Sequence, residues 1–351
     1  MDLTHFQSPP EDICIVRLSA LGDTCHALAV VRNLQDNWPA ARITWIIAKV
    51  EALLLADIPD VEFIIFDKSK GRAAYNDVKK ALAGRKFDVA LCMHASLRAN
   101  RLCRLIPAPV RIGFDWRRAR DFQWLFTNRR IPYKANEHAL DAMMGFARAI
   151  GAEPKTMRWD IPLSEADRAF AKQYCNYPTL VISPCTSQRS RNFRNWPVEN
   201  YVEIARYAQQ RYGCRILLTG GASELEREFG EVIAVQGGPN VINLIGKTTL
   251  KQSVAIFAAA DLLLSPDSGP AHMATAAGTP VLGIYATSNP DRTGPYVSRR
   301  LTVNRYPDAL LKFMGKRVEQ VRWGQRVRSA EAMELILISD VTDKIDDFFT
   351  K

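Results

Sequence analysis

The sequence lacks the patterns that mark several common classes of protein. No apolar run approaches the roughly 20 residues that a transmembrane helix needs, and the first residues show neither the basic nor the apolar part of a secretory signal. The seven cysteines include no Cys-x-x-Cys pair, which is typical of a reduced chain without a zinc site or a disulfide framework. We therefore expect a cytoplasmic protein with no transmembrane segment.

Three motifs that bind nucleotides or metals are also absent. The chain has no Gly-x-Gly-x-x-Gly after a strand, no Gly-x-x-x-x-Gly-Lys-Ser/Thr and no Asp-x-Asp. These absences disfavour, in turn, a dinucleotide-dependent oxidoreductase, a P-loop NTPase and a transferase that holds its substrate through a metal ion. We expect neither a cofactor nor a metal site.

What the sequence does contain is a regular alternation of apolar strands and helical segments over 351 residues, enough for two domains. This rhythm predicts an α/β fold with two parallel sheets. The expected domains are residues 1–165 and 166–330, followed by a helical segment at 331–351, capped by Ser339, that packs back on the first domain. The expected strands are 12–18, 43–48, 61–66, 87–93 and 110–114, and then 179–183, 215–219, 241–244, 261–265 and 280–285.

Positive charge is concentrated in one stretch of the chain. The formal net charge is +10, but residues 68–134 hold 17 Lys and Arg against four Asp and Glu, a net +13, so the remainder carries −3. Such a region attracts nucleic acid, an anionic membrane surface or a phosphorylated acceptor. For any single arginine a solvated surface is the better interpretation, but the scarcity of acids favours a binding role for the cluster. No RNP-like, zinc-finger or helix-turn-helix pattern accompanies it, which disfavours nucleic acid.

Ligands of open parallel sheets bind beyond the carboxyl ends of the strands, so the residues that follow each expected strand are candidates for a site. The first strand is followed by Ser-Ala-Leu-Gly-Asp-Thr at 19–24. Gly22 permits a tight turn, and Asp23 opens the next helix. Asp23 is either an ordinary helix cap or a carboxylate that takes a proton from an acceptor hydroxyl, and the residues alone leave these two interpretations even.

Strand ends in the second half are rich in small polar residues. The sequence SPDSGPAH at 265–272 joins a strand to a helix with proline in its first turn, which leaves backbone N–H groups available to an anion. Hydroxyls and then cations follow residue 183, a combination suited to a diphosphate. The glycine-rich turn at 219–224 ends in Glu224, which either holds a ribose or simply complements the helix dipole.

In combination, these motifs resemble those of one enzyme family. Residues 263–296 (LLSPDSGPAHMATAAGTPVLGIYATSNPDRTGPY) resemble the signature of the ADP-heptose:lipopolysaccharide heptosyltransferases, glycosyltransferase family 9. Residues 15–31 (IVRLSALGDTCHALAVV) resemble the opening motif of that family, and the segments at 194–197 and 246–250 fall in the expected order. The resemblance covers most of the chain and is weakest over 68–134 and after 300. Within the family, the sequence is similar to the heptosyltransferase I type.

The resemblance implies a GT-B fold, with two Rossmann-like domains whose parallel sheets face each other across a cleft. It implies inverting, metal-independent transfer of L-glycero-D-manno-heptose from ADP-heptose to the Kdo of a lipid A-Kdo acceptor. The enzyme would be peripheral at the inner face of the inner membrane.

By motif match, Asp23 takes the general-base position of the family. The donor-binding positions are Thr186, Ser187, Arg194, Glu224, Thr248, Asp267, Ser268, Gly269 and His272. Alignment back from Trp196 favours Arg194 over Arg189 and Arg191 as the cation of the diphosphate site. The acceptor-binding candidates in the basic region are Lys68, Lys70, Arg72, Arg98, Arg101, Arg117, Arg118 and Arg120.

Two alternatives remain open. One keeps the fold and the chemistry but uses a later inner-core acceptor or another nucleotide sugar. The other is a non-catalytic protein that binds nucleic acid or a membrane through the basic region, and it leaves the polar strand ends of the second half unexplained. Residues 306–327 have no assigned role.

Overall fold

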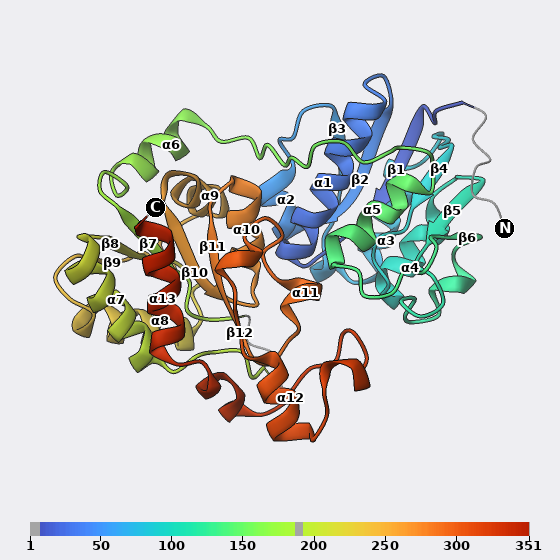
Figure 1. Cartoon of the computed structure of the whole chain (residues 1–351). Coiled ribbons are helices and arrows are strands. Elements are labelled where there is room, and N and C mark those ends of the chain that lie inside the picture. Colours follow the sequence, from blue (N-terminus) through green and yellow to red (C-terminus); the bar gives the residue numbers. More distant parts are fainter. Residues whose placement is uncertain (1–7, 187–191, 351) are drawn as a thin grey trace. The chain divides into compact units, whose positions relative to one another are not determined.

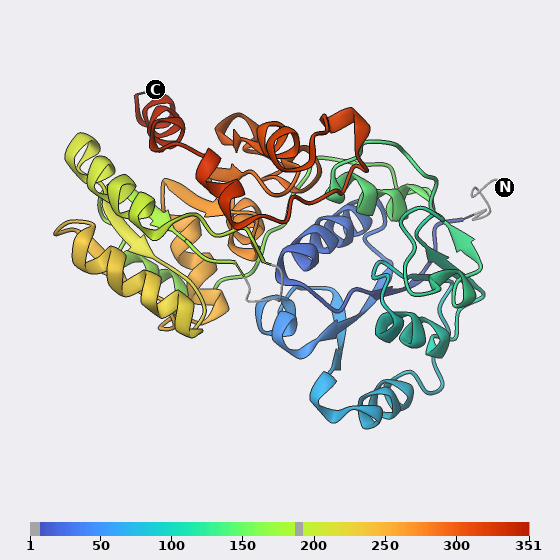
Figure 2. The ribbon, with the colours of Figure 1, turned by 90° about the horizontal axis from the view of Figure 1, so that it is seen from below.

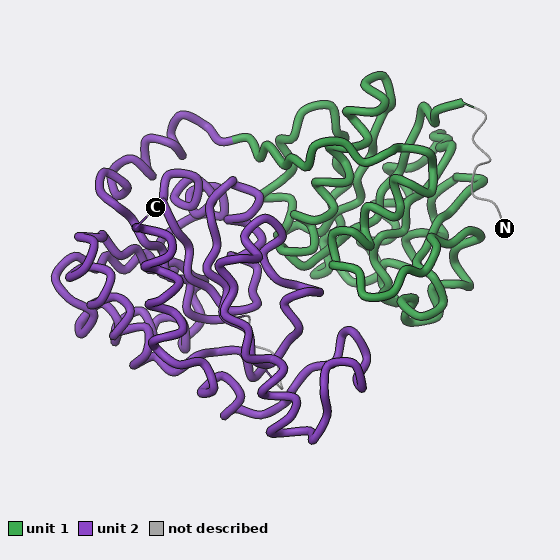
Figure 3. The backbone as a smooth tube through the Cα atoms, viewed as in Figure 1, with its two compact units in different colours: residues 1–162 green, residues 163–351 purple. Residues whose placement is uncertain are grey.

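The computed structural model describes residues 8–186 and 192–350, which form two compact units. Unit 1 spans Met1–Pro162 and unit 2 spans Leu163–Lys351 (Figure 3). This division lies three residues before the boundary that the sequence predicts. Among the described residues, no helix combines the length and the apolar character needed to cross a bilayer.

Unit 1 is built on a parallel sheet of six strands in the order β3-β2-β1-β4-β5-β6 (Figure 1). Strand β1 lies between β2 and β4 in the interior of the sheet, and its side chains are almost completely buried. This is the strand order of a Rossmann fold. The chain adds strands on one side of β1 up to β3 and then on the other side from β4 onward. The strands are β1 (Asp12–Val16), β2 (Arg42–Ala48), β3 (Val61–Phe66), β4 (Val89–Leu91), β5 (Val110–Gly113) and β6 (Arg129–Arg130).

Helices cover both faces of this sheet. Figure 2 shows α1 and α5 on one face and α3 and α4 on the other. The second face is held by an apolar cluster that includes Val16, Val78 and Leu102. The helices of unit 1 are α1 (Leu21–Asn37), α2 (Lys49–Leu55), α3 (Arg72–Ala81), α4 (Leu97–Leu105) and α5 (Ala139–Arg148).

Unit 2 repeats the same sheet topology, with the strand order β12-β11-β10-β7-β8-β9. Its strands are β7 (Thr179–Ile182), β8 (Arg215–Leu218), β9 (Val241–Asn243), β10 (Leu262–Pro266), β11 (Val281–Tyr285) and β12 (Val303–Asn304). Its helices are α6 (Glu165–Lys172), α7 (Val198–Tyr212), α8 (Glu224–Gln236), α9 (Leu250–Ala259), α10 (Gly269–Ala277), α11 (Pro290–Thr293), α12 (Tyr306–Met314) and α13 (Ile338–Phe349).

The predicted α/β fold with two parallel sheets is confirmed, and each of the ten predicted strands has a counterpart. The sequence analysis missed β6 and β12, which have only two residues each. It also missed α6 beside the predicted boundary, although Ser164 and Asp167 form a capping box there.

The start of the C-terminal helix differs from expectation. It begins at Ile338 with Leu337 as its cap residue, and Asp340 bonds back to the Leu337 N–H, so Ser339 is not the cap. Its contacts include α7 of unit 2, where the hydroxyls of Tyr207 and Tyr212 donate to Asp346 at 2.6 and 2.7 Å. The helix therefore packs within unit 2, and its expected packing on the first domain stays a prediction.

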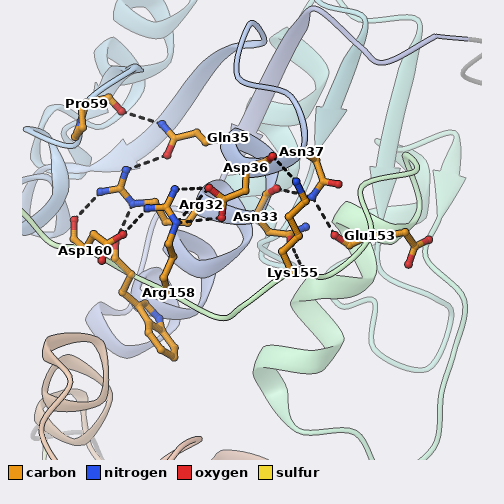
Figure 4. A network of polar contacts seen from close by, with 11 residues as sticks. Arg32, Asn33, Gln35, Asp36, Asn37, Pro59, Glu153, Lys155, Arg158 and Asp160 are labelled. Atoms are coloured by element: carbon orange, nitrogen blue, oxygen red, sulfur yellow. Dashed lines mark hydrogen bonds and ion pairs between the residues drawn. The ribbon is translucent and has the colours of Figure 1, made fainter.

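A polar network fixes the segment by which the chain leaves unit 1 (Figure 4). Arg32 of α1 donates to the carbonyls of Trp159 and Asp160 at 2.9 and 2.6 Å. Arg158 pairs with Asp36 of the same helix at 2.5 Å. Because several of these bonds are partly buried, they hold residues 158–160 against α1, the helix that also carries Asp23.

Candidate functional site

Strand β1 leads into an ion pair between Arg17 and Asp23. The Arg17 side chain is 9% exposed, donates to the Met93 carbonyl at 2.7 Å and lies 2.5 Å from Asp23 Oδ2. Asp23 sits in the first turn of α1, and its side chain is 44% exposed. It also accepts a long bond of 3.5 Å from the Ala20 N–H. Asp23 thus combines a weak capping contact with a carboxylate that is fixed by a buried cation and open to solvent.

His94 follows β4, the neighbour of β1 in the sheet, and lies beside this ion pair. Its Nδ1 accepts from the Leu18 N–H at 3.3 Å. Burial first, and then the charge of Arg17, lower the pKa of His94 to about 4. The imidazole is therefore neutral at pH 7, with its proton on Nε2, where it can donate a hydrogen bond. The sequence analysis assigned no role to Arg17 or His94, although Arg17 directly follows β1 and His94 lies three residues after β4.

The acceptor-binding candidates follow the carboxyl ends of three strands of the sheet, of which β4 and β5 are neighbours and β3 is an edge strand. Lys68, Lys70 and Arg72 come after β3, Arg98 and Arg101 lie on α4 after β4, and Arg117, Arg118 and Arg120 come after β5. Because the sheet is parallel, these segments all begin at the edge where β1 ends beside Asp23. Seven of these eight cations are exposed.

Arg118 is the exception among these cations. Its side chain is 22% exposed and pairs with the buried carboxylate of Asp115. It also lies 2.9 Å from Glu137 Oε2 and donates to the Pro132 carbonyl at 2.8 Å. These contacts tie the loop after β5 to the loop after β6, so Arg118 has a structural role in the fold.

Unit 2 has a buried polar cluster at the end of β10. Arg194 Nη1 donates to the Asp267 carbonyl at 2.7 Å and lies 3.5 Å from the Asp267 carboxylate. These two side chains are 15% and 8% exposed. The carboxylate also accepts from the Ser288 hydroxyl at 2.8 Å. Asp267 therefore orients the Arg194 guanidinium, and its carboxylate partly neutralises the positive charge of that group.

Residues far along the chain complete this cluster. Ser288 pairs with Arg326 in an antiparallel bridge, and Arg326 Nη2 lies 3.9 Å from the Asp267 carboxylate. The hydroxyl of Tyr306 donates to the Gln325 carbonyl at 2.9 Å and holds this returning segment. The sequence analysis missed both Ser288 and Arg326, and the structure places Arg326, from the unassigned segment 306–327, beside Asp267.

Thr186 joins the same cluster through two asparagines. Its N–H and its hydroxyl both donate to Asn195 Oδ1, at 3.0 and 3.1 Å, and its hydroxyl accepts from Asn192. Arg194 Nε donates to Asn192 Oδ1 at 3.1 Å. The predicted Ser187, together with Arg189 and Arg191, lies outside the described residues.

Helix α10 begins directly after this cluster. The hydroxyl of Ser268, its cap residue, lies 2.8 Å from that of Ser265 and makes no capping bond, so the first N–H groups of the helix are not covered by a cap side chain. Gly269 and Pro270 form the first turn with His272, which is partly exposed. An uncapped helix N-terminus next to Arg194 favours an anion such as a phosphate.

The two remaining donor candidates lie after β8 and β9. Glu224 is the exposed first residue of α8, whereas Glu226 contacts the glycine turn, with Oε1 accepting from the Gly221 N–H at 2.7 Å. Thr248 lies before α9, and its hydroxyl is 2.8 Å from that of Ser253. The structure thus places a second carboxylate, Glu226, in the turn that the sequence analysis assigned to Glu224.

No metal cluster stands out in the described ranges. Across residues 8–186 and 192–350, no three His, Cys, Asp or Glu side chains come together in a way that could hold a metal ion.

Comparison with known proteins decides the family. The sequence profile of glycosyltransferase family 9 (heptosyltransferase) matches residues 76–314. The lipopolysaccharide core heptosyltransferase OpsX of Haemophilus influenzae is 38% identical over 338 residues, which cover 96% of each chain. The chain belongs to glycosyltransferase family 9. This confirms the resemblance seen in the sequence and removes the non-catalytic alternative, because family 9 proteins are transferases.

Other members of family 9 share the length and the fold. Lipopolysaccharide heptosyltransferase 1 of Salmonella typhimurium is 22% identical over 299 residues, which cover 81% of this chain and 91% of the relative. The solved structure of Escherichia coli heptosyltransferase WaaC with ADP matches with a TM-score of 0.74 at 20% identity, over 96% of this chain and 99% of that one. The predicted GT-B class is therefore confirmed at the level of the fold.

Proposed function

We propose that this family 9 glycosyltransferase transfers L-glycero-D-manno-heptose from ADP-heptose to the Kdo of a lipid A-Kdo acceptor. The observation that carries the proposal is the buried cluster of Arg194 and Asp267 beside the uncapped start of α10. Such a site suits the diphosphate of a nucleotide sugar without a divalent ion. The similarity to a lipopolysaccharide core heptosyltransferase supports heptose as the sugar.

In unit 1, Asp23 is the proposed general base. Its exposed carboxylate accepts the proton of a Kdo hydroxyl as the oxygen attacks the anomeric carbon of the heptose. Arg17 holds the carboxylate in place, and neutral His94 offers Nε2–H to an oxygen of the acceptor. The new glycosidic bond forms on the face opposite the departing ADP, so the configuration inverts.

In unit 2, the proposed role is to receive the charge of the leaving group. As the bond between the anomeric carbon and the phosphate oxygen breaks, negative charge grows on the β-phosphate of ADP. Arg194 and the first N–H groups of α10 are already oriented by the fold, so no large rearrangement is needed when that charge appears. Metal-independent transfer is part of this proposal, and full activity in EDTA is the expected result.

The acceptor is proposed to be recognised by charge. Its Kdo carboxylate and the phosphates of lipid A are anionic, and the exposed cations after β3, β4 and β5 provide the matching charge. The proposal therefore includes a peripheral location at the inner face of the inner membrane, where a lipid-borne acceptor is accessible. A later inner-core acceptor is the second candidate, because it would use the same nucleotide site and the same general base.

Calorimetric titration tests the donor assignment directly. ADP-heptose should bind, while UDP-sugars and oligonucleotides should bind at least tenfold more weakly. An Arg194→Ala variant should lose most of the ADP-heptose heat, and an Asp23→Asn variant should keep it. Preferential binding of a UDP-sugar would overturn the donor assignment, and tight binding of the oligonucleotide would give the basic region another partner.

A further inference from the structure

Large apolar side chains project into solvent from one part of unit 1. Trp116, Phe122 and Leu125, in the segment between β5 and β6, are 62%, 61% and 66% exposed. Leu97 at the start of α4 and Tyr133 after β6 are 44% and 43% exposed. We call these five residues the aromatic surface. Scattered exposed apolar residues are normal, but a contiguous group marks an interaction site.

Ring contacts through Trp124 join two of these residues, Trp116 and Phe122. Trp124 lies 5.5 Å from Trp116 and 5.4 Å from Phe122, measured between ring centroids. The guanidinium of Arg130 lies 3.9 Å above the Trp116 ring, and that of Arg117 lies 4.5 Å above the Tyr133 ring. Cations therefore sit among the aromatic rings, in the arrangement that cation–π attraction favours.

The backbone at Phe122 has an unfavourable conformation. Asp121 and Phe122 both have left-handed backbone angles, with φ of 50° and 58°, which bulky residues rarely adopt. The turn is fixed by the fold, because Asn100 Nδ2 donates to the carbonyls of Arg120 and Asp121 and the Leu97 N–H donates to Asp121 Oδ2 at 2.9 Å. A strained turn that holds an apolar ring in solvent indicates a functional requirement for that ring.

The charge around these rings is strongly positive. From residue 97 to residue 134 the chain has ten Arg and Lys and two Asp. Both acids are used within the fold, since Asp115 pairs with Arg118 and Asp121 accepts from the Leu97 N–H. Of these two acids only Asp121 is exposed, so the exposed charge that accompanies the rings is predominantly cationic.

We propose that the aromatic surface docks on an anionic phospholipid bilayer, with Trp116, Phe122 and Leu125 entering the interfacial layer and the neighbouring arginines contacting lipid phosphates. Aromatic rings beside arginine suit this layer, which is apolar on one side, hydrated on the other and negatively charged. The inference rests on the proposed function in one respect, namely that the acceptor is a lipid. It adds the element that holds the enzyme to the bilayer, at the same edge of the sheet as Asp23.

Vesicle sedimentation tests this proposal. The full-length protein is mixed with vesicles of phosphatidylethanolamine and phosphatidylglycerol, and the bound fraction is compared with that of a Trp116→Ser/Phe122→Asn double variant. Asparagine tolerates the left-handed backbone at position 122, so the fold should be retained. The double variant should bind at least about tenfold more weakly, because it removes two rings that would leave water on docking. Brominated acyl chains should quench the tryptophan fluorescence of the wild type more than that of the variant.

Tyr177 provides the matched control. It is 60% exposed in unit 2 and lies under Arg215 at 4.5 Å, so it repeats the pairing of Tyr133 with Arg117 outside the aromatic surface. Tyr177→Ser should bind vesicles as the wild type does. Equal vesicle binding by the wild type and the double variant would overturn the proposal. It would also be overturned if sedimentation velocity showed a wild-type dimer that the double variant dissolves, because the surface would then join two copies of the chain.

A transfer assay separates this inference from the proposed function. With a deacylated, water-soluble Kdo acceptor and no vesicles, the double variant should transfer heptose at the wild-type rate. With the acceptor embedded in vesicles, its rate should fall about tenfold or more. Should the wild type transfer no heptose to either acceptor, the proposed function fails while the vesicle-binding result still decides the docking proposal.

Discussion

The cations that we propose to bind ligands are held in opposite ways in the two units. In unit 2, Arg194 and Asp267 are 15% and 8% exposed and bond to each other, and Ser288 bonds to the same carboxylate. In unit 1, a typical basic residue such as Lys70 is 56% exposed and pairs with Asp77, itself 46% exposed. Buried, bonded groups keep their geometry, whereas exposed ion pairs are weak and exchange readily with other partners.

This difference matches the two ligands that we propose. The diphosphate of a nucleotide sugar always has the same shape, so a preformed cluster can receive the charge that grows during transfer. A lipid with several phosphates is larger and more variable, and long exposed cations can adapt to it. Binding in unit 1 should therefore weaken steeply with salt, and binding in unit 2 much less.

The largest expected effect is on Asp23. Asp23→Asn keeps the size of the side chain but cannot accept a proton, so turnover should fall by a factor of about 10²–10⁴. The Kd for ADP should stay within about twofold of the wild type, since the nucleotide is assigned to unit 2. Steady-state turnover and calorimetry measure the two quantities. Turnover near the wild-type rate would remove Asp23 from the role of general base.

The second-largest expected effect is that of a substitution at Arg194. Arg194→Ala removes the cation that is oriented toward the growing charge, and kcat/KM for the donor should fall about 10²-fold. Arg326→Ala is the matched variant, because Arg326 lies 3.9 Å from the same carboxylate and is 50% exposed. Its effect should be several times smaller. If both variants lost the same activity, the preformed pair of Arg194 and Asp267 would have no special role.

Arg118 and Arg120, two positions apart in the sequence, allow the same comparison of a partly buried and an exposed cation within unit 1. Arg120 is exposed, so Arg120→Glu should raise the KM for the acceptor about tenfold, more at low salt, without changing the midpoint of unfolding. Arg118→Ala removes the cation that pairs with the buried carboxylate of Asp115 and contacts Glu137, whose other cation, Arg148, lies 3.7 Å away, and it should cost about 3 kcal/mol of the free energy of unfolding. Chemical denaturation and acceptor titrations distinguish the two. A stable Arg118→Ala variant with a raised KM would return Arg118 to the acceptor site.

The smallest effect concerns His94 and pH. The pKa of His94 is lowered to about 4 in the folded protein, from its usual value near 6.5. Between these values the unfolded chain binds a proton that the native chain does not, so this residue makes the fold less stable as the pH falls from 6.5 to 4. His94→Gln should remove about 2 kcal/mol of this pH dependence between pH 7.5 and pH 5. Parallel denaturation curves at pH 7.5 and pH 5 for both proteins measure it, and an equal pH dependence in the two would contradict the assignment.

The sequence predicted what depends on short-range pattern. Residues 265–272 combine a buried strand, small polar residues and a helix start within eight positions, and the structure has β10, the Asp267 cluster and α10 there. The contacts of Arg326 with Asp267 and of His94 with Leu18 were missed. They join residues distant in the chain, and only the order of the strands in the sheet brings them together.

At some positions, side-chain contacts in the fold determine the structure where the residue type alone predicts something else. Ser339 is a better cap type than Leu337, yet Asp340 bonds to the Leu337 N–H and pairs with Arg305 at 2.5 Å, and these contacts set the start of α13. Arg118 looks in sequence like the exposed arginines around it. Its partners Pro132 and Glu137 come from the loop after β6, a strand too short to be predicted.

The most direct test of the account is a single transfer reaction. The purified protein is incubated in EDTA with ADP-heptose and, separately, with lipid A-Kdo and with an acceptor that already carries one heptose, and the products are analysed by mass spectrometry. The account predicts that lipid A-Kdo gains one heptose and that this product is absent with Asp23→Asn. Transfer only to the heptosylated acceptor, or only after a divalent metal is restored, would contradict it.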